Sequence, residues 1–182
     1  MNKAFTKESD NDEFTEAVVQ PVDLLPPNVP NYVTPEGARR VREELRRLID
    51  EEKPALEVQA SARQGGDGAL ANESKTKARK KLAEVTARIQ LLESHIGRFQ
   101  IVDGRQQRAD TVRFGARVTV IDTEGDERTY LICGVDESEP ETGDVSWISP
   151  IAKVLLGRKI GDEVTLQLPR GEQLLEIVEI DY

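Results

Sequence analysis

Apolar residues recur in alternating steps of four and three positions along one segment of about twenty residues. They are Ala78, Leu82, Val85, Ile89, Leu92, Ile96 and Phe99. This repeat places a single apolar stripe along a helix and is typical of the seam of a coiled coil, which must be buried against a second helix. The segment therefore predicts a long helix with a helical partner.

The partner is predicted just upstream, where a similar stripe follows Thr34. It consists of Val41, Leu45, Leu48 and Ile49, and weakens through Ala55, Leu56, Val58 and Ala62 before a glycine-rich break at residues 65–68. Thr34 and Pro35 are typical of a helix start, because threonine caps the free amides and proline lacks only an unused N–H. Two helices of about 28 residues, each about 42 Å long, predict an antiparallel hairpin.

Three details of this hairpin are predicted by single residues. Pro54 falls inside the first helix and predicts a kink there. Asn72 is the expected cap of the second helix, which we expect to end near Gln100.

Beyond residue 103 the apolar period changes from helical to two, which predicts strands. We expect them over residues 117–122, 128–135, 144–148, 164–168 and 173–180. Ser149 and Pro150 predict the start of a short helix over residues 151–156. The fold class is therefore α+β: a long hairpin over residues 31–102, with its tip near residues 64–73, and an antiparallel sheet with one short helix over residues 103–182. The polar residues 1–30 are expected to form an acidic, disordered or extended tail.

Charge is divided unevenly along the chain, whose formal net charge is −9. It is −4 over residues 1–32, +3 over residues 33–102 and −8 over residues 103–182. An acidic globule is repelled by bare duplex DNA, which excludes strong nonspecific DNA binding. No apolar run is long enough to cross a membrane, and the N-terminus does not have the pattern of a signal peptide.

Candidate catalytic residues are few. His95 is the only histidine, and the helical pattern places it on a solvated flank without a partner. Cys133 is the only cysteine; we expect a small buried side chain, and its inability to form an internal disulfide suits a reducing cytoplasm. No zinc spacing, phosphate loop or Ser/His/Asp pattern is present. The sequence thus does not predict a self-sufficient enzyme or a cofactor of its own.

Several short motifs, in order and at consistent spacing from residue 31 to 182, resemble the GreA/GreB bacterial transcription elongation factors. They are Asn31-Tyr32-Val33-Thr34-Pro35-Glu36-Gly37, Glu51-Glu52-Lys53-Pro54, Ile101-Val102-Asp103, Ser149-Pro150-Ile151-Ala152-Lys153-Val154-Leu155-Leu156-Gly157 and Gly161-Asp162-Glu163-Val164. The resemblance implies an FKBP-like C-terminal globule at the rim of the secondary channel of RNA polymerase and a coiled coil that reaches the active centre. It implies a cytoplasmic accessory factor, which we expect to be a monomer, with any RNA cleavage carried out by the polymerase.

The tip departs from the family pattern, which is roughly Gly-Asp-x-Ser-Glu-Asn and whose two acids help to hold a second Mg²⁺. When Asn72 is aligned with the family asparagine, Ala71 occupies the glutamate position, and only a shift of register recovers Asp67. Asp67 and Glu73 are the candidate ligands of a Mg²⁺ shared with the polymerase. The alternative for Asp67 is an ordinary turn residue, and the alternative for Glu73 is a carboxylate in the first turn of a helix. We therefore expect a channel-occupying regulator that stimulates cleavage poorly, with a full cleavage factor as the alternative.

The resemblance also suggests two contact surfaces. A basic stretch, which otherwise reads as a solvated helix face, is the candidate contact with the 3′ segment of the nascent RNA: Lys75, Lys77, Arg79, Lys80 and Lys81. The candidate polymerase-binding residues are Trp147, Ile148, Ser149 and Pro150, with Ile148 where the family often has an acid. Ser149 and Pro150 are also explained as a helix start, and Trp147 or Ile148 as a core residue.

Two readings from other classes remain open. The first is an FKBP-like prolyl isomerase or chaperone, whose aromatic pocket would have to use Phe114, Tyr130, Trp147 and Tyr182. The second is a structural hairpin that dimerises through its apolar seam.

Overall fold

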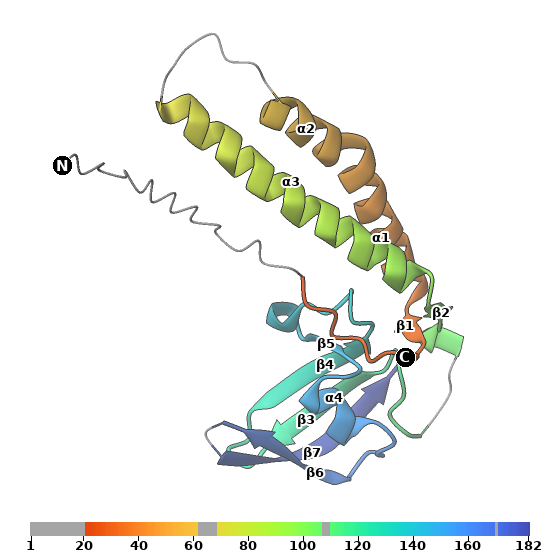
Figure 1. Cartoon of the computed structure of the whole chain (residues 1–182). Coiled ribbons are helices and arrows are strands. Elements are labelled where there is room, and N and C mark those ends of the chain that lie inside the picture. Colours follow the sequence, from red (N-terminus) through yellow and green to blue (C-terminus); the bar gives the residue numbers. More distant parts are fainter. Residues whose placement is uncertain (1–20, 62–68, 107–109, 170) are drawn as a thin grey trace, which may run out of the picture.

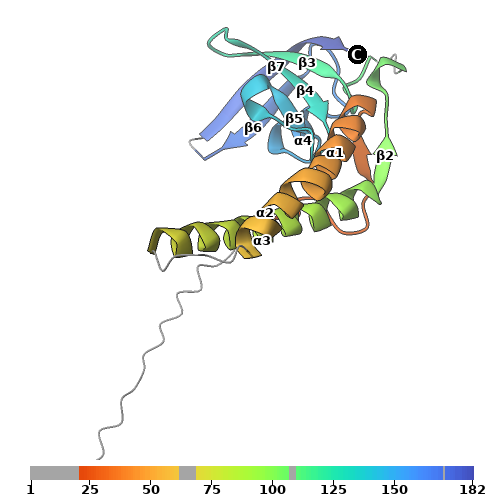
Figure 2. The ribbon, with the colours of Figure 1, turned by 90° about the horizontal axis from the view of Figure 1, so that it is seen from above.

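The computed structural model describes residues 21–61, 69–106, 110–169 and 171–182, which form a long helical arm standing on a curled β-sheet (Figures 1 and 2). We use "arm" for the four helical elements α1, η1, α2 and α3, and "globule" for the part from residue 103 onward. The mixed α+β class predicted from the sequence is confirmed.

The first half of the arm begins where the sequence predicted. Helix α1 spans Pro35–Arg47, and the Oγ1 of its N-cap Thr34 accepts a hydrogen bond from the backbone N–H of Gly37 at 2.9 Å. This bond satisfies one of the amides that the first turn of a helix leaves unpaired. Pro35 occupies the first helical position, as expected.

A turn of π-helix, η1 over Leu48–Glu52, separates α1 from α2 over Lys53–Ser61. The backbone N–H of Lys53 donates to the carbonyl of Leu48, and Pro54, which follows, has no N–H to donate. Leu56 comes eight residues after Leu48, about 80° past two full turns of a regular α-helix. The wider turn brings Leu56 back against the buried face of the arm. The irregularity predicted at Pro54 is thus present, one turn before the proline.

Helix α3 spans Ala69–Ile96, 28 residues or about 42 Å, and packs along α1 and α2 (Figure 1). It begins before Asn72, so the predicted cap is wrong: Asn72 is a helical residue whose carbonyl accepts from the Thr76 hydroxyl at 3.0 Å. The apolar stripe is buried between the helices in one cluster of Val41, Leu48, Val85, Ile89 and Leu92.

A small parallel sheet closes the base of the arm. Strand β1, Asn31–Val33, pairs with β2, Phe99–Ile101. Helix α3 therefore ends at Ile96 and not near Gln100, because the chain turns at Gly97 and continues as a strand. The strand that enters the arm and the strand that leaves it are thus held together at its base.

The globule is a five-stranded sheet in the order β5-β4-β3-β7-β6. Its elements are β3 (Arg117–Asp122), β4 (Glu127–Cys133), β5 (Asp144–Ser146), α4 (Pro150–Leu155), β6 (Glu163–Leu168) and β7 (Gly171–Asp181), with short 3₁₀ turns η2 (Gly104–Gln106) and η3 (Pro140–Thr142). The prediction of a wholly antiparallel sheet is wrong at one edge, where β5 runs parallel to β4. The ten-residue connection through η3 is long enough to reverse the chain before β5 begins.

The core of the globule lies between the sheet and α4. It contains Val118, Val120, Ile132, Ile177 and Ala152, all fully buried. Alternation along β3 and β7 supplies Val118, Val120 and Ile177, as the period of two predicts, whereas Ile132 comes from β4 and Ala152 from α4. Cys133 is also buried, as expected for a small apolar side chain.

Residues 21–30, which we call the strap, are the described part of the predicted N-terminal tail. The strap has no regular secondary structure, but it crosses between α3 and the globule (Figure 1). The Leu25 side chain is 3% exposed, and its backbone N–H donates to Asp23 Oδ1 at 2.9 Å. Residues 1–20 lie outside the described part of the chain. In that part, no helix is both long enough and apolar enough to span a membrane.

Candidate functional site

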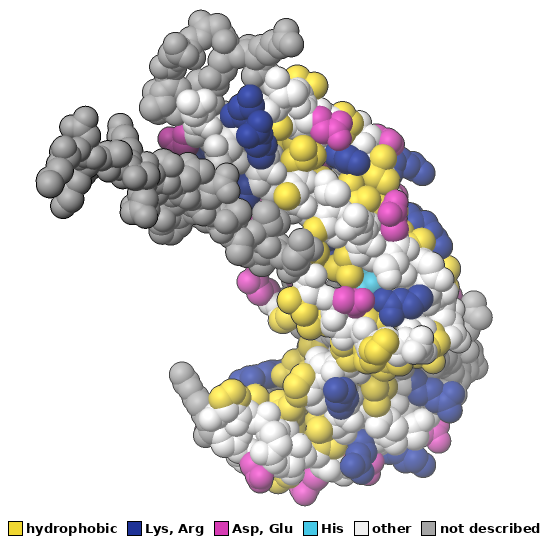
Figure 3. Space-filling view, in the orientation of Figure 1, with side chains coloured by type: hydrophobic (Ala, Val, Ile, Leu, Met, Phe, Trp, Pro, Cys, Tyr) yellow, Lys and Arg dark blue, Asp and Glu magenta, His cyan; other side chains and the backbone are white. Residues whose placement is uncertain are grey.

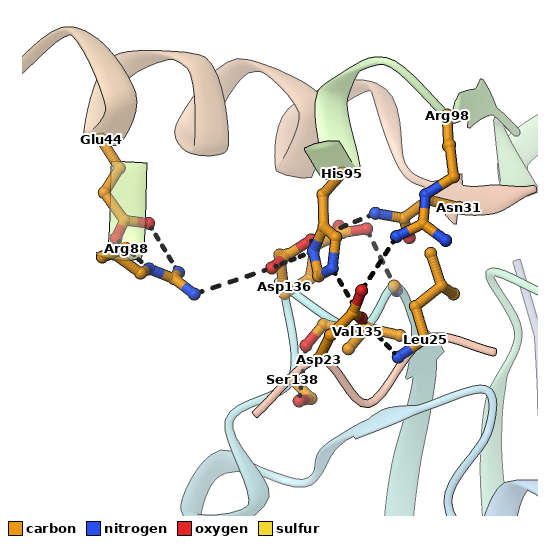
Figure 4. A network of polar contacts seen from close by, with 12 residues as sticks. Asp23, Leu25, Asn31, Glu44, Arg88, His95, Arg98, Val135, Asp136 and Ser138 are labelled. Atoms are coloured by element: carbon orange, nitrogen blue, oxygen red, sulfur yellow. Dashed lines mark hydrogen bonds and ion pairs between the residues drawn. The ribbon is translucent and has the colours of Figure 1, made fainter. Parts of the chain in front are cut away.

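His95 lies at the point where the arm, the globule and the strap meet (Figure 4). It is only 1% exposed. Its Nδ1 is 2.8 Å from Asp136 Oδ2 of the globule, and its Nε2 is 2.9 Å from Asp23 Oδ1 of the strap. The prediction of a solvated, unpartnered histidine is wrong, because the globule and the strap cover this flank of α3.

The charges around His95 favour its protonated form. The hydrogen bond to Asp136 raises the pKa of His95 above its ordinary value, burial opposes this rise, and the bond to Asp23 adds to it. Burial alone would raise the pKa of Asp136, but hydrogen bonding and charge from His95 hold that pKa below its ordinary value. The imidazolium thus bridges two carboxylates from two different parts of the fold.

Further polar contacts tie the same three parts together. Asn31 Nδ2 donates to Asp136 Oδ2 at 3.1 Å, and Arg98 Nη2 lies 3.2 Å from Asp23 Oδ2. Arg88 pairs with Glu44 across the arm at 2.9 Å, and its Nη1 lies 3.9 Å from Asp136 Oδ1 (Figure 4). We call His95, Asp136, Asp23, Asn31, Arg88 and Arg98 the junction network.

Glu137, the neighbour of Asp136, is buried at the start of α1. Its carboxylate accepts from the backbone N–H of Thr34 at 2.8 Å, from the Thr34 hydroxyl and from the backbone N–H of Gly134 at 3.1 Å. A Cβ on Gly37 would lie 1.9 Å from Glu137 Cδ, so the carboxylate fits only because residue 37 has no side chain. A negative charge at the N-terminus of α1 is also favoured by the helix dipole. The arm is therefore fixed to the globule at both of its helices.

An apolar groove of about 810 Å³ lies beside this junction, between the strap and the globule. Its lining is Leu24, Pro26, Val29, Val135, Ser138, Pro140, Val145, Ser146, Trp147, Ile148, Ser149, Pro150 and Lys153. All four residues predicted to bind polymerase are in this set. Ser149 and Trp147 also have the structural roles that the sequence offered as alternatives. Ser149 Oγ caps α4 by accepting from the backbone N–H of Ala152 at 3.3 Å, and Trp147 packs on the core and edge-on against Tyr32, 5.4 Å between ring centroids.

The four aromatic residues that an isomerase pocket would need are not gathered in this groove. Trp147 lines it, whereas Phe114 faces Tyr32 with 6.0 Å between ring centroids. The Tyr182 hydroxyl donates to the carbonyl of Thr111 at 2.7 Å, and Tyr130 packs against the core. The groove is therefore mainly apolar, with Trp147 as the one aromatic side chain in its lining.

At the other end of the arm, Glu73 and the basic stretch all lie on α3. The Glu73 carboxylate is 2.6 Å from Lys77 Nζ, and Lys81 Nζ is 3.5 Å from Glu84 Oε2. At 100° per residue, Lys75 and Arg79 share one face, and Lys77 and Lys81 another. Figure 3 shows Lys and Arg side chains near this end of the arm. Asp67 lies outside the described residues, so the predicted pairing of Asp67 with Glu73 is not tested.

Sequence models of known families match nearly the whole chain after the strap. The model described as "Transcription elongation factor, N-terminal" matches residues 31–101, and "Transcription elongation factor, GreA/GreB, C-term" matches residues 106–182. The chain belongs to the GreA/GreB family.

Individual GreA and GreB proteins are similar over most of their length. Transcription elongation factor GreA of Alkalilimnicola ehrlichii is 41% identical over 153 residues, covering 82% of this chain and 96% of that protein. The GreA of Desulfovibrio desulfuricans is 35% identical over 151 residues, with 82% and 93% covered. The GreB of Neisseria meningitidis serogroup B is 32% identical over 153 residues, with 84% and 94% covered.

Among solved structures, a GreA factor homolog 1 (Gfh1) protein of Thermus thermophilus is similar at 23% identity. It has a TM-score of 0.39, covering 85% of this chain and 100% of that one.

Residues 31–37, which open the segment matched by the N-terminal family model, attach the arm to the globule. Asn31 binds Asp136, Thr34 caps α1 and binds Glu137, and Gly37 leaves room for the Glu137 carboxylate. The motif is thus the attachment of the arm to the globule. The strap, in contrast, precedes the first residue matched by the family models.

Proposed function

We propose that this protein is a bacterial elongation factor that binds RNA polymerase with its globule and inserts its arm toward the active centre. In this proposal the globule is FKBP-like and docks at the rim of the secondary channel, and the arm is a coiled coil that enters it. The observation that supports this most is a helical arm of about 42 Å attached to a globule by a buried polar junction. It would act in the cytoplasm as a monomer.

The attachment matters because an arm delivers its tip to a defined place only if its base is fixed. At the base of the arm, His95 of α3 bonds to Asp136 of the globule, and Glu137 of the globule bonds to Thr34 at the start of α1. The pairing of β1 with β2 joins the chain that enters the arm to the chain that leaves it. Buried polar contacts at the base favour one geometry of the joint, although Asn31 Oδ1 and Arg98 Nε are buried without a hydrogen-bond partner among the described residues. A flexible joint would spread the tip over many positions and reduce its effective concentration at the active centre.

We propose that the tip regulates backtracked polymerase without stimulating cleavage efficiently. Efficient cleavage needs a second Mg²⁺, and the tip can help to hold that ion only with carboxylates that are free to bind it. Ala71 offers no ligand, and the Glu73 carboxylate is already 2.6 Å from Lys77 Nζ. Within the described residues no group of three or more His, Cys, Asp or Glu could hold a metal. These features support a tip that binds a second Mg²⁺ poorly, and in this proposal any RNA cleavage is that of the polymerase's own active site.

The basic stretch is the proposed contact with the 3′ segment of the nascent RNA. Lys75, Lys77, Arg79, Lys80 and Lys81 lie within the first half of α3, on more than one face of the helix. Lysine and arginine bind a phosphate chain by charge and without sequence preference. An extruded RNA of any sequence would therefore be accepted.

The test uses purified core RNA polymerase and stalled, backtracked elongation complexes. We expect the protein to bind the polymerase and to displace another channel-entering factor, with little shortening of the RNA. The Ala71→Glu variant should increase the rate of shortening, whereas Ala71→Gln, of the same size but without charge, should not.

Three results would contradict parts of the proposal. Absence of polymerase binding would refute the function as a whole. Rapid shortening by the wild-type protein that is lost in Asp67→Ala would establish the full cleavage factor, with Asp67 as a ligand. Shortening in the absence of polymerase would show that the protein itself cuts RNA.

A further inference from the structure

The strap is held in place by contacts to both the arm and the globule. Asp23 Oδ1 lies 2.9 Å from His95 Nε2 of α3, and Asp23 Oδ2 lies 3.2 Å from Arg98 Nη2, just after α3. The Pro26 carbonyl accepts from Arg98 Nη1 at 3.4 Å. The side chain of Leu25, also a strap residue, is buried. These contacts fix the strap backbone against the fold, so its other side chains are presented in defined directions.

Three residues of the fixed strap form one wall of the apolar groove. Leu24, Pro26 and Val29 line it from the strap, opposite the globule residues around Trp147 and Ile148. Figure 3 shows hydrophobic side chains gathered where the strap lies between the arm and the globule. The groove is thus built partly by residues that precede the segments matched by the family models.

The exposed side chains at the groove indicate what it binds. Leu24 is 65% exposed although its neighbour Leu25 is 3% exposed, so the wall has apolar surface that the other described residues leave uncovered. Glu139 and Glu141 are exposed on either side of the lining residue Pro140, and Lys153 is the one cation in the lining. The globule as a whole carries a net charge of −8. An apolar segment flanked by lysine or arginine is complementary to such a surface.

We propose that the strap completes the docking groove and that Leu24 contacts an apolar, basic-flanked segment of RNA polymerase. This rests on the proposed function and adds a wall that the family domains alone do not supply. Because the strap is anchored through Asp23 to His95 of the arm, the groove takes its full shape only while arm, strap and globule are joined. Docking and the direction of the arm are therefore linked.

The test measures the affinity of the full-length protein for core RNA polymerase. Leu24→Ser removes apolar surface from the groove and should weaken binding about tenfold. Val22→Ser is the matched control, because Val22 is a strap residue that is 75% exposed and does not line the groove, and its affinity should stay within about twofold of wild type. Glu139→Lys should also weaken binding, most strongly at low salt.

The variant Ile148→Ser separates this proposal from the proposed function. If Ile148→Ser weakens binding and Leu24→Ser does not, the strap has no part in docking and the inference is overturned, while the proposed function stands. If the wild-type protein does not bind polymerase, the proposed function fails and the inference with it. If the wild-type protein sediments as a dimer that Leu24→Ser dissociates, the occupant is a second copy of the chain and the inference is again overturned.

Discussion

His95 and Asp136 face each other across the boundary between the arm and the globule, with 2.8 Å between Nδ1 and Oδ2. Both side chains are buried, and Asp23 of the strap binds the other nitrogen of the imidazole. A buried ion pair of this kind is strongly destabilised when one partner is removed, because the remaining charge is left in a medium of low polarity. The pair therefore makes the attachment of the arm sensitive to changes at a single residue.

The first prediction concerns the pH dependence of stability. Because the pKa of His95 is raised on folding, its contribution is complete below its ordinary value of about 6.5 and is lost as the pH rises through the higher folded value. The pKa of Asp136 is lowered, so its contribution is present above its ordinary value and is lost as the pH falls through the lower folded value. As the pH rises above about 6.5, the free energy of unfolding should therefore fall more steeply in wild type than in His95→Gln.

Urea unfolding at several pH values measures this difference. Ser94→Ala, at an exposed position next to His95, serves as the control and should follow the wild-type pH dependence. A wild-type curve parallel to that of His95→Gln would show that folding does not raise the pKa of His95.

The second prediction concerns Gly37. In Gly37→Ala the added Cβ would displace the Glu137 carboxylate from its bonds to Thr34 and Gly134, which should lower the free energy of unfolding by about 2 kcal/mol. Gly97→Ala is the control, because its nearest neighbours would be 3.6 Å away. Thermal unfolding compares the two variants, and equal melting temperatures would show that the carboxylate can move at no cost.

The third prediction concerns the thiol of Cys133. Burial, together with the charges of Glu137 and Asp144, raises the pKa of this thiol to about 12. Because only the thiolate reacts, labelling of the folded protein with Ellman's reagent at pH 8 should be about a thousandfold slower than in urea. Rapid stoichiometric labelling without denaturant would contradict the burial of this side chain.

The fourth prediction concerns the basic stretch of α3. The double variant Lys75→Gln with Arg79→Gln should bind backtracked complexes more weakly, with the salt dependence reduced by about one unit of slope for each lost phosphate contact. Complexes without extruded RNA should bind as before. Arg117→Gln, an exposed position on β3, controls for net charge. An equal loss for both kinds of complex would place these cations against the polymerase and not against RNA.

The elements defined by local patterns were predictable from the sequence. The stripe containing Val85, Ile89 and Leu92 is buried along α3, and the alternation over residues 117–122 is strand β3 with its predicted bounds. Thr34 and Ser149 both cap helices where they were expected. Each of these features depends on residues within one or two turns of each other, which is the range over which a single sequence carries information.

Most of the wrong predictions concern features that depend on residues far apart in the sequence. His95 is 41 residues from Asp136 and 72 from Asp23, so no local pattern reveals its partners. The parallel pairing of β1 with β2 joins segments almost seventy residues apart. Helix α3 starts at Ala69 and not at Asn72, because a good capping residue can also continue a helix that already extends past it.

The groove was predictable only in part. Trp147, Ile148, Ser149 and Pro150 were expected to meet a partner, and all four line it. The strap wall could not be expected, since Leu24, Pro26 and Val29 lie in a polar segment without period. Their position follows from Asp23 and Leu25, whose partners the sequence does not indicate.

The wider turn at Leu48–Glu52 sets which face of α2 meets α3. Adding whole α-helical turns to both helices would extend the arm by about 5.4 Å per turn. Deleting one residue from this turn would shorten it by only about 1.5 Å, yet would rotate α2 by about 100° and carry Leu56 off its packing surface. A change of one residue at this place would thus loosen the outer half of the arm while its base stays as it is.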